Sequence, residues 1–199
     1  MNPRLPPLAP AGLDTEQREL YDAIAGGPRS QGRQGFPLIG ADGALTGPFN
    51  AMLLRPRLGA ALQALGAAVR YQTRLDGRSR EIAILVVASL ADSAFERYAH
   101  EAVGRQAGLT ETDLAAIRDG RYGELNGGYE RTVARTVATL VRVGDLDDGQ
   151  YADAVRQLGI ETVFELLTLV GYYLTLALQL RVFRVAVPAP ADPARKPNP

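Results

Sequence analysis

The chain has 199 residues, of which 46% are hydrophobic and 22% charged, a composition typical of one globular domain, or two small packed halves, with a substantial core. Lys and Arg together number 22, as do Asp and Glu, so the charge balance gives no support to nucleic-acid binding. The sequence contains no cysteine and one histidine, which excludes disulfides, thiol catalysis, cysteine zinc sites and a histidine-rich metal site within one chain.

The N-terminal part, residues 1–46, is predicted to be an extension made of a short helix and a long loop. Its first 12 residues are rich in proline and lack the apolar segment of a secretory signal, so we expect a cytoplasmic protein. A helix is predicted over 14–25, with Asp14 or Thr15 as its N-cap. Residues 26–48 follow as a loop rich in Gly and Pro, whose glycines lack the spacing of a phosphate-binding loop.

From residue 49 onwards, apolar residues recur at helical spacing, which predicts an all-α fold. The predicted helices cover 49–54, 58–74, 78–90, 93–106, 110–118, 129–143, 151–158 and 160–183. The second of these is amphipathic, with Leu58, Leu65 and Val69 on its apolar stripe. We therefore expect a helical domain over 47–187, followed by a disordered proline-rich tail over 188–199.

The most apolar segment, residues 163–180, approaches the length that crosses a membrane. Glu165 and Gln179 interrupt it, and two tyrosines lie in its middle. We interpret it as a buried or subunit-interface helix and expect no membrane partner. Tyr172 and Tyr173 are expected to pack at that interface.

The single histidine lies in the stretch 92-DSAFERYAH-100. In one interpretation Ser93 and Glu96 form a capping box at a helix start, and His100 is a polar residue on the helix. In the other, the stretch is part of a proton-transfer site. Glu81 lies in an apolar run, where a buried carboxylate needs a partner, and the next helix carries an imidazole suited to proton transfer near neutral pH.

The stretch 80-REIAILVVASLADSAFERYAHEAVGRQAGL-109 resembles the carboxymuconolactone decarboxylase family, which shares its fold with the alkylhydroperoxidase D-like (AhpD-like) proteins. The resemblance extends upstream to residue 47 and, more weakly, over 159–183. The peroxidase branch carries a glutamate, a C-x-x-C pair and a histidine, and Glu81, Ser93, Glu96 and His100 stand here at the same spacing. The resemblance therefore implies the branch without thiols, and the absence of cysteine excludes peroxide reduction through cysteine.

The resemblance implies an all-α fold of about six main helices, no organic cofactor, a small-molecule substrate and assembly into homo-oligomers, either trimers or hexamers. It also implies an acid/base enzyme that decarboxylates or isomerises a small unsaturated lactone or keto acid, as the family's namesake does with 4-carboxymuconolactone. In that reading His100 is the acid/base, Glu81 orients it, Glu96 assists it or holds the helix start, and Ser93 caps the helix or binds substrate. The alternative is a non-catalytic small-molecule-binding or scaffold protein that retains the fold.

Asn50 and Phe49, which follow the long loop, are candidate substrate-binding residues, as is Tyr98. Arg55, Arg57, Arg70 and Arg74 flank the helix before Glu81. We expect them to be solvated arginines on a helix face, and the alternative is that one of them anchors a substrate carboxylate. Glu81, Glu96 and His100 together resemble a two-carboxylate, one-histidine metal set, but because the chain supplies no second histidine we expect no metal.

Overall fold

The structure, a computed structural model, describes residues 2–27 and 35–188. Within these ranges it has nine α-helices, two short 3-10 helices and no strand beyond an isolated bridge between Ile39 and Leu45. The predicted all-α fold is confirmed. The predicted disordered tail lies, except for residue 188, outside the described residues.

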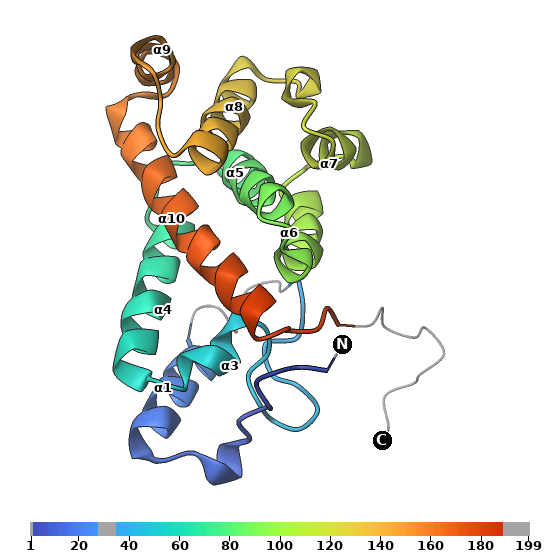
Figure 1. Cartoon of the computed structure of the whole chain (residues 1–199), viewed down its shortest axis with the longest axis vertical. Coiled ribbons are helices and arrows are strands. Elements are labelled where there is room, and N and C mark those ends of the chain that lie inside the picture. Colours follow the sequence, from blue (N-terminus) through green and yellow to red (C-terminus); the bar gives the residue numbers. More distant parts are fainter. Residues whose placement is uncertain (1, 28–34, 189–199) are drawn as a thin grey trace.

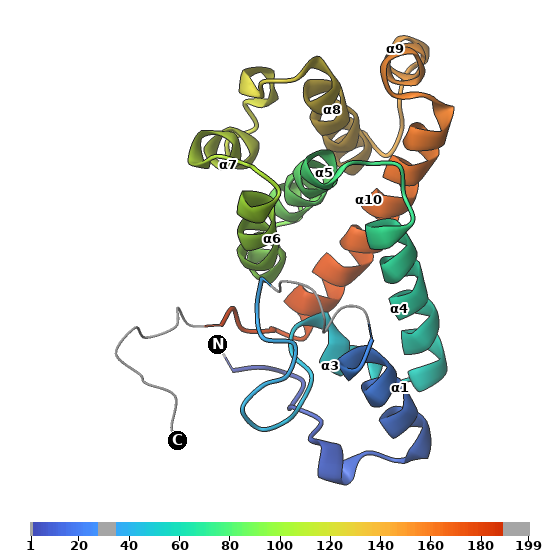
Figure 2. The same cartoon turned by 180° about the vertical axis from the view of Figure 1, so that it is seen from behind.

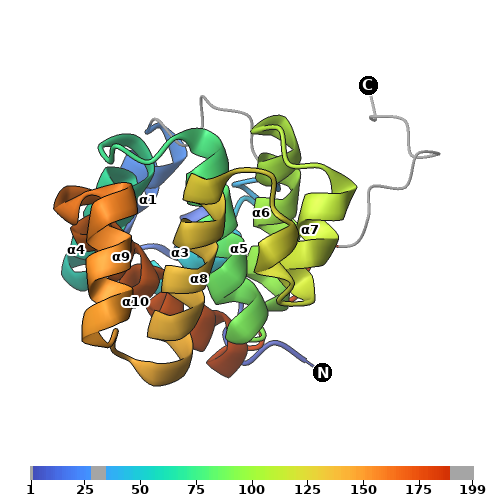
Figure 3. The ribbon, with the colours of Figure 1, turned by 90° about the horizontal axis from the view of Figure 1, so that it is seen from above.

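The helices follow the predicted order along the chain (Figure 1). Their bounds are α1 Thr15–Ala25, α3 Pro48–Met52, α4 Pro56–Tyr71, α5 Gly77–Leu90, α6 Ala94–Gln106, α7 Glu111–Arg118, α8 Gly128–Val143, α9 Asp148–Leu158 and α10 Ile160–Val182, with 3-10 helices at Pro10–Gly12 and Tyr122–Glu124. Helix α5 lies in the middle and contacts α6, α7, α8 and α10. The view from above shows these neighbours arranged around it (Figure 3).

Helix α5 is central because it is apolar on every side. Each residue from Ile82 to Ala88 is at most 3% exposed. A helix that is hydrophobic all round is stable only when other elements cover all its faces. Glu81 begins this run and is 0% exposed, so the fold places a carboxylate in the core.

The structure confirms two predicted helix starts. Asp14 caps α1 and forms a capping box with Gln17. Thr110 and Asp113 form the same arrangement at α7. In both, each side chain bonds to the backbone N–H of the other residue, which satisfies amides that the helix leaves unpaired.

The predicted capping box of Ser93 and Glu96 is wrong. Ser93 is the N-cap of α6, but its side chain makes no capping hydrogen bond. The turn between α5 and α6 is tight, and the N–H of Ser93 donates to the carbonyl of Ala88 at 2.9 Å. That N–H is the donor to which the Glu96 carboxylate would reach back, so the box cannot form.

Helix α4 buries only part of the stripe that its sequence suggested. Leu58 is 71% exposed and Leu65 is 40% exposed, whereas Gly59, Gly66 and Val69 are buried. A Cβ on Gly59 would lie 2.2 Å from the carbonyl oxygen of Met52. Gly59 thus allows close approach of α4 to the α3 backbone, and Leu58 and Leu65 face outward.

By length and composition, helix α10 is able to cross a membrane. Half of its most apolar stretch is buried inside the structure. Tyr172 and Tyr173 are 3% and 2% exposed, covered by this chain's own residues. The expectation that they pack at a subunit interface is therefore wrong. The helix face exposed to solvent carries other large apolar residues, among them Phe164 and Leu178.

The N-terminal segment is tied to the end of the bundle. The side chain of Asn50 accepts from the N–H of Leu8 at 2.9 Å and donates to the carbonyl of Pro6 at 3.0 Å. The N–H of Arg4 donates to the carbonyl of Phe183 at 2.9 Å, just after α10. Figure 2 shows the segment that leads to α3, which begins beside α6.

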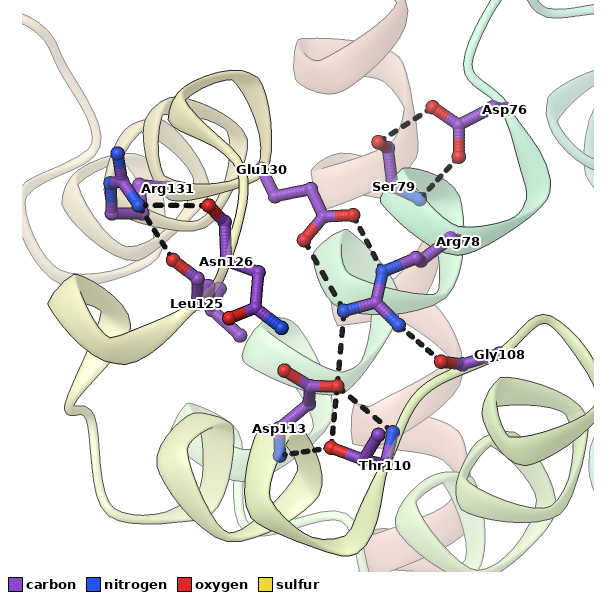
Figure 4. A network of polar contacts seen from close by, with 10 residues as sticks. All are labelled: Asp76, Arg78, Ser79, Gly108, Thr110, Asp113, Leu125, Asn126, Glu130 and Arg131. Carbon is purple, nitrogen blue, oxygen red and sulfur yellow. Dashed lines mark hydrogen bonds and ion pairs between the residues drawn. The ribbon is translucent and has the colours of Figure 1, made fainter.

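An arginine at the start of α5 joins three parts of the fold (Figure 4). The Nε of Arg78 lies 2.6 Å from Oε1 of Glu130 on α8, and one terminal nitrogen lies 3.0 Å from Oδ2 of Asp113 on α7. The other terminal nitrogen donates to the carbonyl of Gly108. These contacts hold the first turn of α5 in register, one helical turn before Glu81.

Candidate active site

Two adjacent core helices bring the only histidine against a buried carboxylate. Glu81 of α5 and His100 of α6 are joined by a 2.7 Å hydrogen bond between Oε2 and Nδ1. Glu81 is fully buried, and His100 is 7% exposed. The predicted partnership of these residues is thus present in the fold, across a helix pair that the short turn after Leu90 holds together.

The surroundings keep Glu81 ionised. Burial acts to raise the pKa of this carboxyl, but the charge of His100 and its hydrogen bond outweigh burial and lower the pKa below its ordinary value. Arg70 and Arg80 act in the same direction, and the Nε of Arg80 lies 4.0 Å from Oε1. An ionised acceptor at Nδ1 requires a proton on that nitrogen. The other ring nitrogen, Nε2, is directed away from Glu81.

His100 lines a cavity of about 70 Å³. Since a water molecule needs roughly 10–15 Å³ by this measure, the cavity suits a small ligand. Its wall is largely aromatic, formed by Phe36, Phe49, Tyr71, Phe95, Tyr172 and Tyr173. The ring of Tyr173 meets that of His100 edge to face, with centroids 5.2 Å apart at 85°. The imidazole is thereby held by Glu81 on one side and by an aromatic ring on another.

Glu96 lines the same cavity one helical turn before His100. It is 3% exposed, and among the described residues neither carboxylate oxygen has a hydrogen bond of normal geometry. Burial raises the pKa of Glu96 to about 8, although the nearby Ser93 hydroxyl acts weakly in the opposite direction. At neutral pH this side chain is a neutral carboxylic acid that can donate a hydrogen bond or a proton.

Arg70 also lines the cavity, from the last turn of α4. It is half-buried, and its Nε is buried without a hydrogen bond in the described structure. The residue is therefore not the solvated arginine that the sequence favoured.

The structure brings together four of the predicted site residues, Glu81, His100, Glu96 and Phe49. It places the other three elsewhere. Asn50 binds the N-terminal segment, Tyr98 is half-buried outside the cavity, and Ser93 is buried beneath the start of α6.

Sequence reasoning missed Phe36, Phe95 and the tyrosine pair of α10 as parts of the site. Two adjacent tyrosines inside an otherwise apolar helix were the available signal for Tyr172 and Tyr173, because a buried hydroxyl needs polar surroundings. Phe36 gave no such signal, since its position depends on a loop that folds back onto Phe95, with ring centroids 4.9 Å apart. Within residues 2–27 and 35–188, no group of three or more His, Asp or Glu side chains is placed to hold a metal ion.

The chain has an AhpD-like helical fold. It is similar to an AhpD-core, peroxidase-related protein from Ralstonia eutropha JMP134, at 12% identity and a TM-score of 0.72, over 94% of this chain and 92% of that one. It is also similar to the debrominase Bmp8 bound to 2,3,4-tribromopyrrole, at 13% identity and a TM-score of 0.71, over 95% of this chain and 94% of that one. An Agrobacterium tumefaciens protein of unknown function, named as an AhpD antioxidant defence protein, matches at 19% identity and a TM-score of 0.65, over 71% and 97%.

Residues 56–128 match the model of the carboxymuconolactone decarboxylase family. This segment runs from α4 to the start of α8 and includes Glu81, Glu96 and His100. Over this central segment the chain is similar to that family, as its sequence pattern indicated. Among curated protein sequences, none matches this chain. At these identities the solved structures establish the fold and leave the reaction to be argued from the site.

Proposed function

We propose that the protein is a cofactor-independent acid/base enzyme that decarboxylates or isomerises a small unsaturated lactone or keto acid. The observation that carries the proposal is the buried Glu81–His100 pair at the wall of an aromatic cavity. A charge-assisted bond at Nδ1 fixes the ring and its proton, so Nε2 can exchange a proton with a bound substrate. The aromatic wall excludes water from an anionic intermediate.

The proposed reaction needs no nucleophile. In a decarboxylation, the bond between the substrate and its carboxylate breaks, CO₂ leaves, and the electron pair passes into the conjugated lactone as a dienolate. Protonated His100 then delivers its Nε2 proton to the dienolate carbon. Glu96, as a neutral acid, donates a hydrogen bond to the oxygen on which negative charge develops.

The assay that tests this function measures CO₂ release from 4-carboxymuconolactone by the purified protein and by His100→Gln. We expect turnover in the wild type and a loss of about 10²–10⁴-fold in the variant, the range that a positioned acid/base supplies. Equal turnover by a folded His100→Gln would reject the acid/base role. A folded wild type without turnover would reject the namesake substrate and favour a small-molecule-binding protein.

The likeness to a debrominase and to peroxidase-related proteins does not extend to a thiol reaction, since this sequence contains no cysteine. An assay of peroxide consumption with a thiol reductant is expected to give the same rate with and without the protein. Consumption that depends on the protein would require another redox group and would contradict this expectation.

We also propose that the protein works as a homo-oligomer, a trimer or a hexamer. The support is the outward face of α10, where Phe164, Leu167 and Leu178 are each at least 48% exposed at helical spacing. Monomeric soluble proteins rarely expose large apolar patches of this kind. Light scattering coupled to size exclusion tests it, and Phe164→Asp is expected to shift the mass towards the monomer.

A further inference from the structure

The charge in the cavity is unbalanced. Arg70 brings a guanidinium to the wall, and no described residue forms an ion pair with it. The part-buried Arg78, by contrast, is satisfied by the carboxylates of Glu130 and Asp113 within hydrogen-bonding distance. The Cζ of Arg70 lies 5.8 Å from the ring centroid of Tyr71. A ring face is a weaker partner than a carboxylate, so the guanidinium can still bind an anionic ligand.

Glu81 does not serve as the contact partner of Arg70. Its two oxygens already face other cations, since Oε2 lies 2.7 Å from Nδ1 of His100 and Oε1 lies 4.0 Å from the Nε of Arg80. Its charge reaches Arg70 only through space. Glu96 adds no compensating charge while its carboxyl is protonated, so the described residues that line the cavity carry an excess of positive charge.

We propose that Arg70 anchors the anionic group of the substrate, so that the cavity accepts a small, planar organic anion and discriminates against its uncharged analogue. A guanidinium can form two parallel N–H···O bonds to one carboxylate, which fixes direction as well as position. The aromatic wall then covers the faces of the unsaturated part. This inference rests on the proposed function and deepens it, because it names the charge that the same site selects.

Calorimetric binding tests the inference without requiring turnover. The two probes are 2-furoate, a planar unsaturated carboxylate, and 2-furamide, which has the same shape and no charge. They are titrated into the wild type, Arg70→Gln and Arg74→Gln. Arg74 is the matched control because it is an exposed arginine four residues later, outside the cavity.

We expect the wild type and Arg74→Gln to bind 2-furoate with equal affinity and to bind 2-furamide more weakly. Arg70→Gln should lose about 10–100-fold in affinity for 2-furoate, the equivalent of one charged hydrogen-bonding group. Equal binding of the two probes by the wild type, or no binding of 2-furoate, overturns the proposal. So does an unchanged affinity in Arg70→Gln.

The wild-type comparison stands even if Arg70→Gln fails to fold, since it needs no variant. The experiment also separates this inference from the proposed function. His100→Gln should bind 2-furoate while losing turnover. A wild type that binds 2-furoate selectively through Arg70, yet turns over no lactone or keto acid, would support the anion site and reject the enzyme.

Discussion

Oε2 of Glu81 lies 2.7 Å from Nδ1 of His100, and this bond joins two core helices at residues 19 positions apart. It accounts for a carboxylate that is otherwise costly to bury in an apolar helix. It also sets the orientation of the only imidazole in the chain. Removal of either partner would leave the other in a buried, unsatisfied state.

The first prediction concerns the tautomer of His100. Because the ionised Glu81 accepts at Nδ1, the neutral ring should carry its proton on Nδ1 and leave Nε2 unprotonated. Nitrogen-15 NMR of the imidazole measures this directly, and the single histidine gives one set of ring signals. Glu81→Gln should weaken the preference. A neutral wild-type ring protonated mainly on Nε2 would contradict the hydrogen bond.

Glu96 should make stability depend on pH. Its pKa of about 8 when folded exceeds the ordinary value of 4.5, so between these values the folded state binds more protons than the unfolded state. The contribution of protonated Glu96 to the free energy of unfolding is fully present below about pH 4.5 and is lost as the pH rises to about 8. At about 1.4 kcal/mol per pKa unit, the loss approaches roughly 5 kcal/mol as an upper bound.

Urea unfolding of the wild type and Glu96→Gln at both ends of this range measures that effect. The wild type should lose stability relative to Glu96→Gln as the pH rises, because glutamine cannot ionise. Glu19→Gln, at an exposed position of α1, serves as the control and should track the wild type. Parallel pH profiles for the wild type and Glu96→Gln would show that Glu96 is not buried as a neutral acid.

Arg78 should contribute far more to stability than an exposed arginine that also contacts two carboxylates. Arg78→Gln leaves Asp113 and Glu130, which are 4% and 15% exposed, without their cation. We expect a loss of about 2–4 kcal/mol, slightly below the range for a fully buried pair. Arg121→Gln breaks contacts to Asp119 and Glu124, all about half exposed, and should cost far less, because water screens exposed ion pairs. Equal unfolding midpoints in denaturant would refute the distinction.

Two glycines should respond in opposite ways to alanine. Gly171 lies within α10, and a Cβ there would meet nothing within 4 Å, so Gly171→Ala should stabilise the protein by up to about 1 kcal/mol. Gly47 has φ +61° and ψ −137°, and its Cβ would lie 2.7 Å from the ring of Phe95. Gly47→Ala should therefore destabilise the protein by about 1–3 kcal/mol. Thermal unfolding of both variants measures these effects. A shift of both unfolding midpoints in the same direction would contradict the prediction.

The sequence by itself determined the all-α fold, the order of the helices and the core of the site. Apolar spacing of 3.6 residues and capping residues such as Asp14 and Thr110 act locally, so they can be interpreted without knowing which helices pack together. The sequence also indicated that the buried Glu81 finds its partner on the next helix, but it left open whether Glu81 or Glu96 contacts His100. A carboxylate in an apolar run needs a partner, and the adjacent helix offers one.

Only the tertiary structure decided which side chains face the cavity. Arg70 and Tyr173 are separated by about a hundred positions and meet because α4 and α10 pack together, a long-range contact that no local pattern encodes. Asn50, expected at the site, faces the N-terminal segment instead, because Leu8 and Pro6 offer it backbone partners. The role of Glu96 likewise depended on packing, since the N–H that a capping box would use is taken by the carbonyl of Ala88.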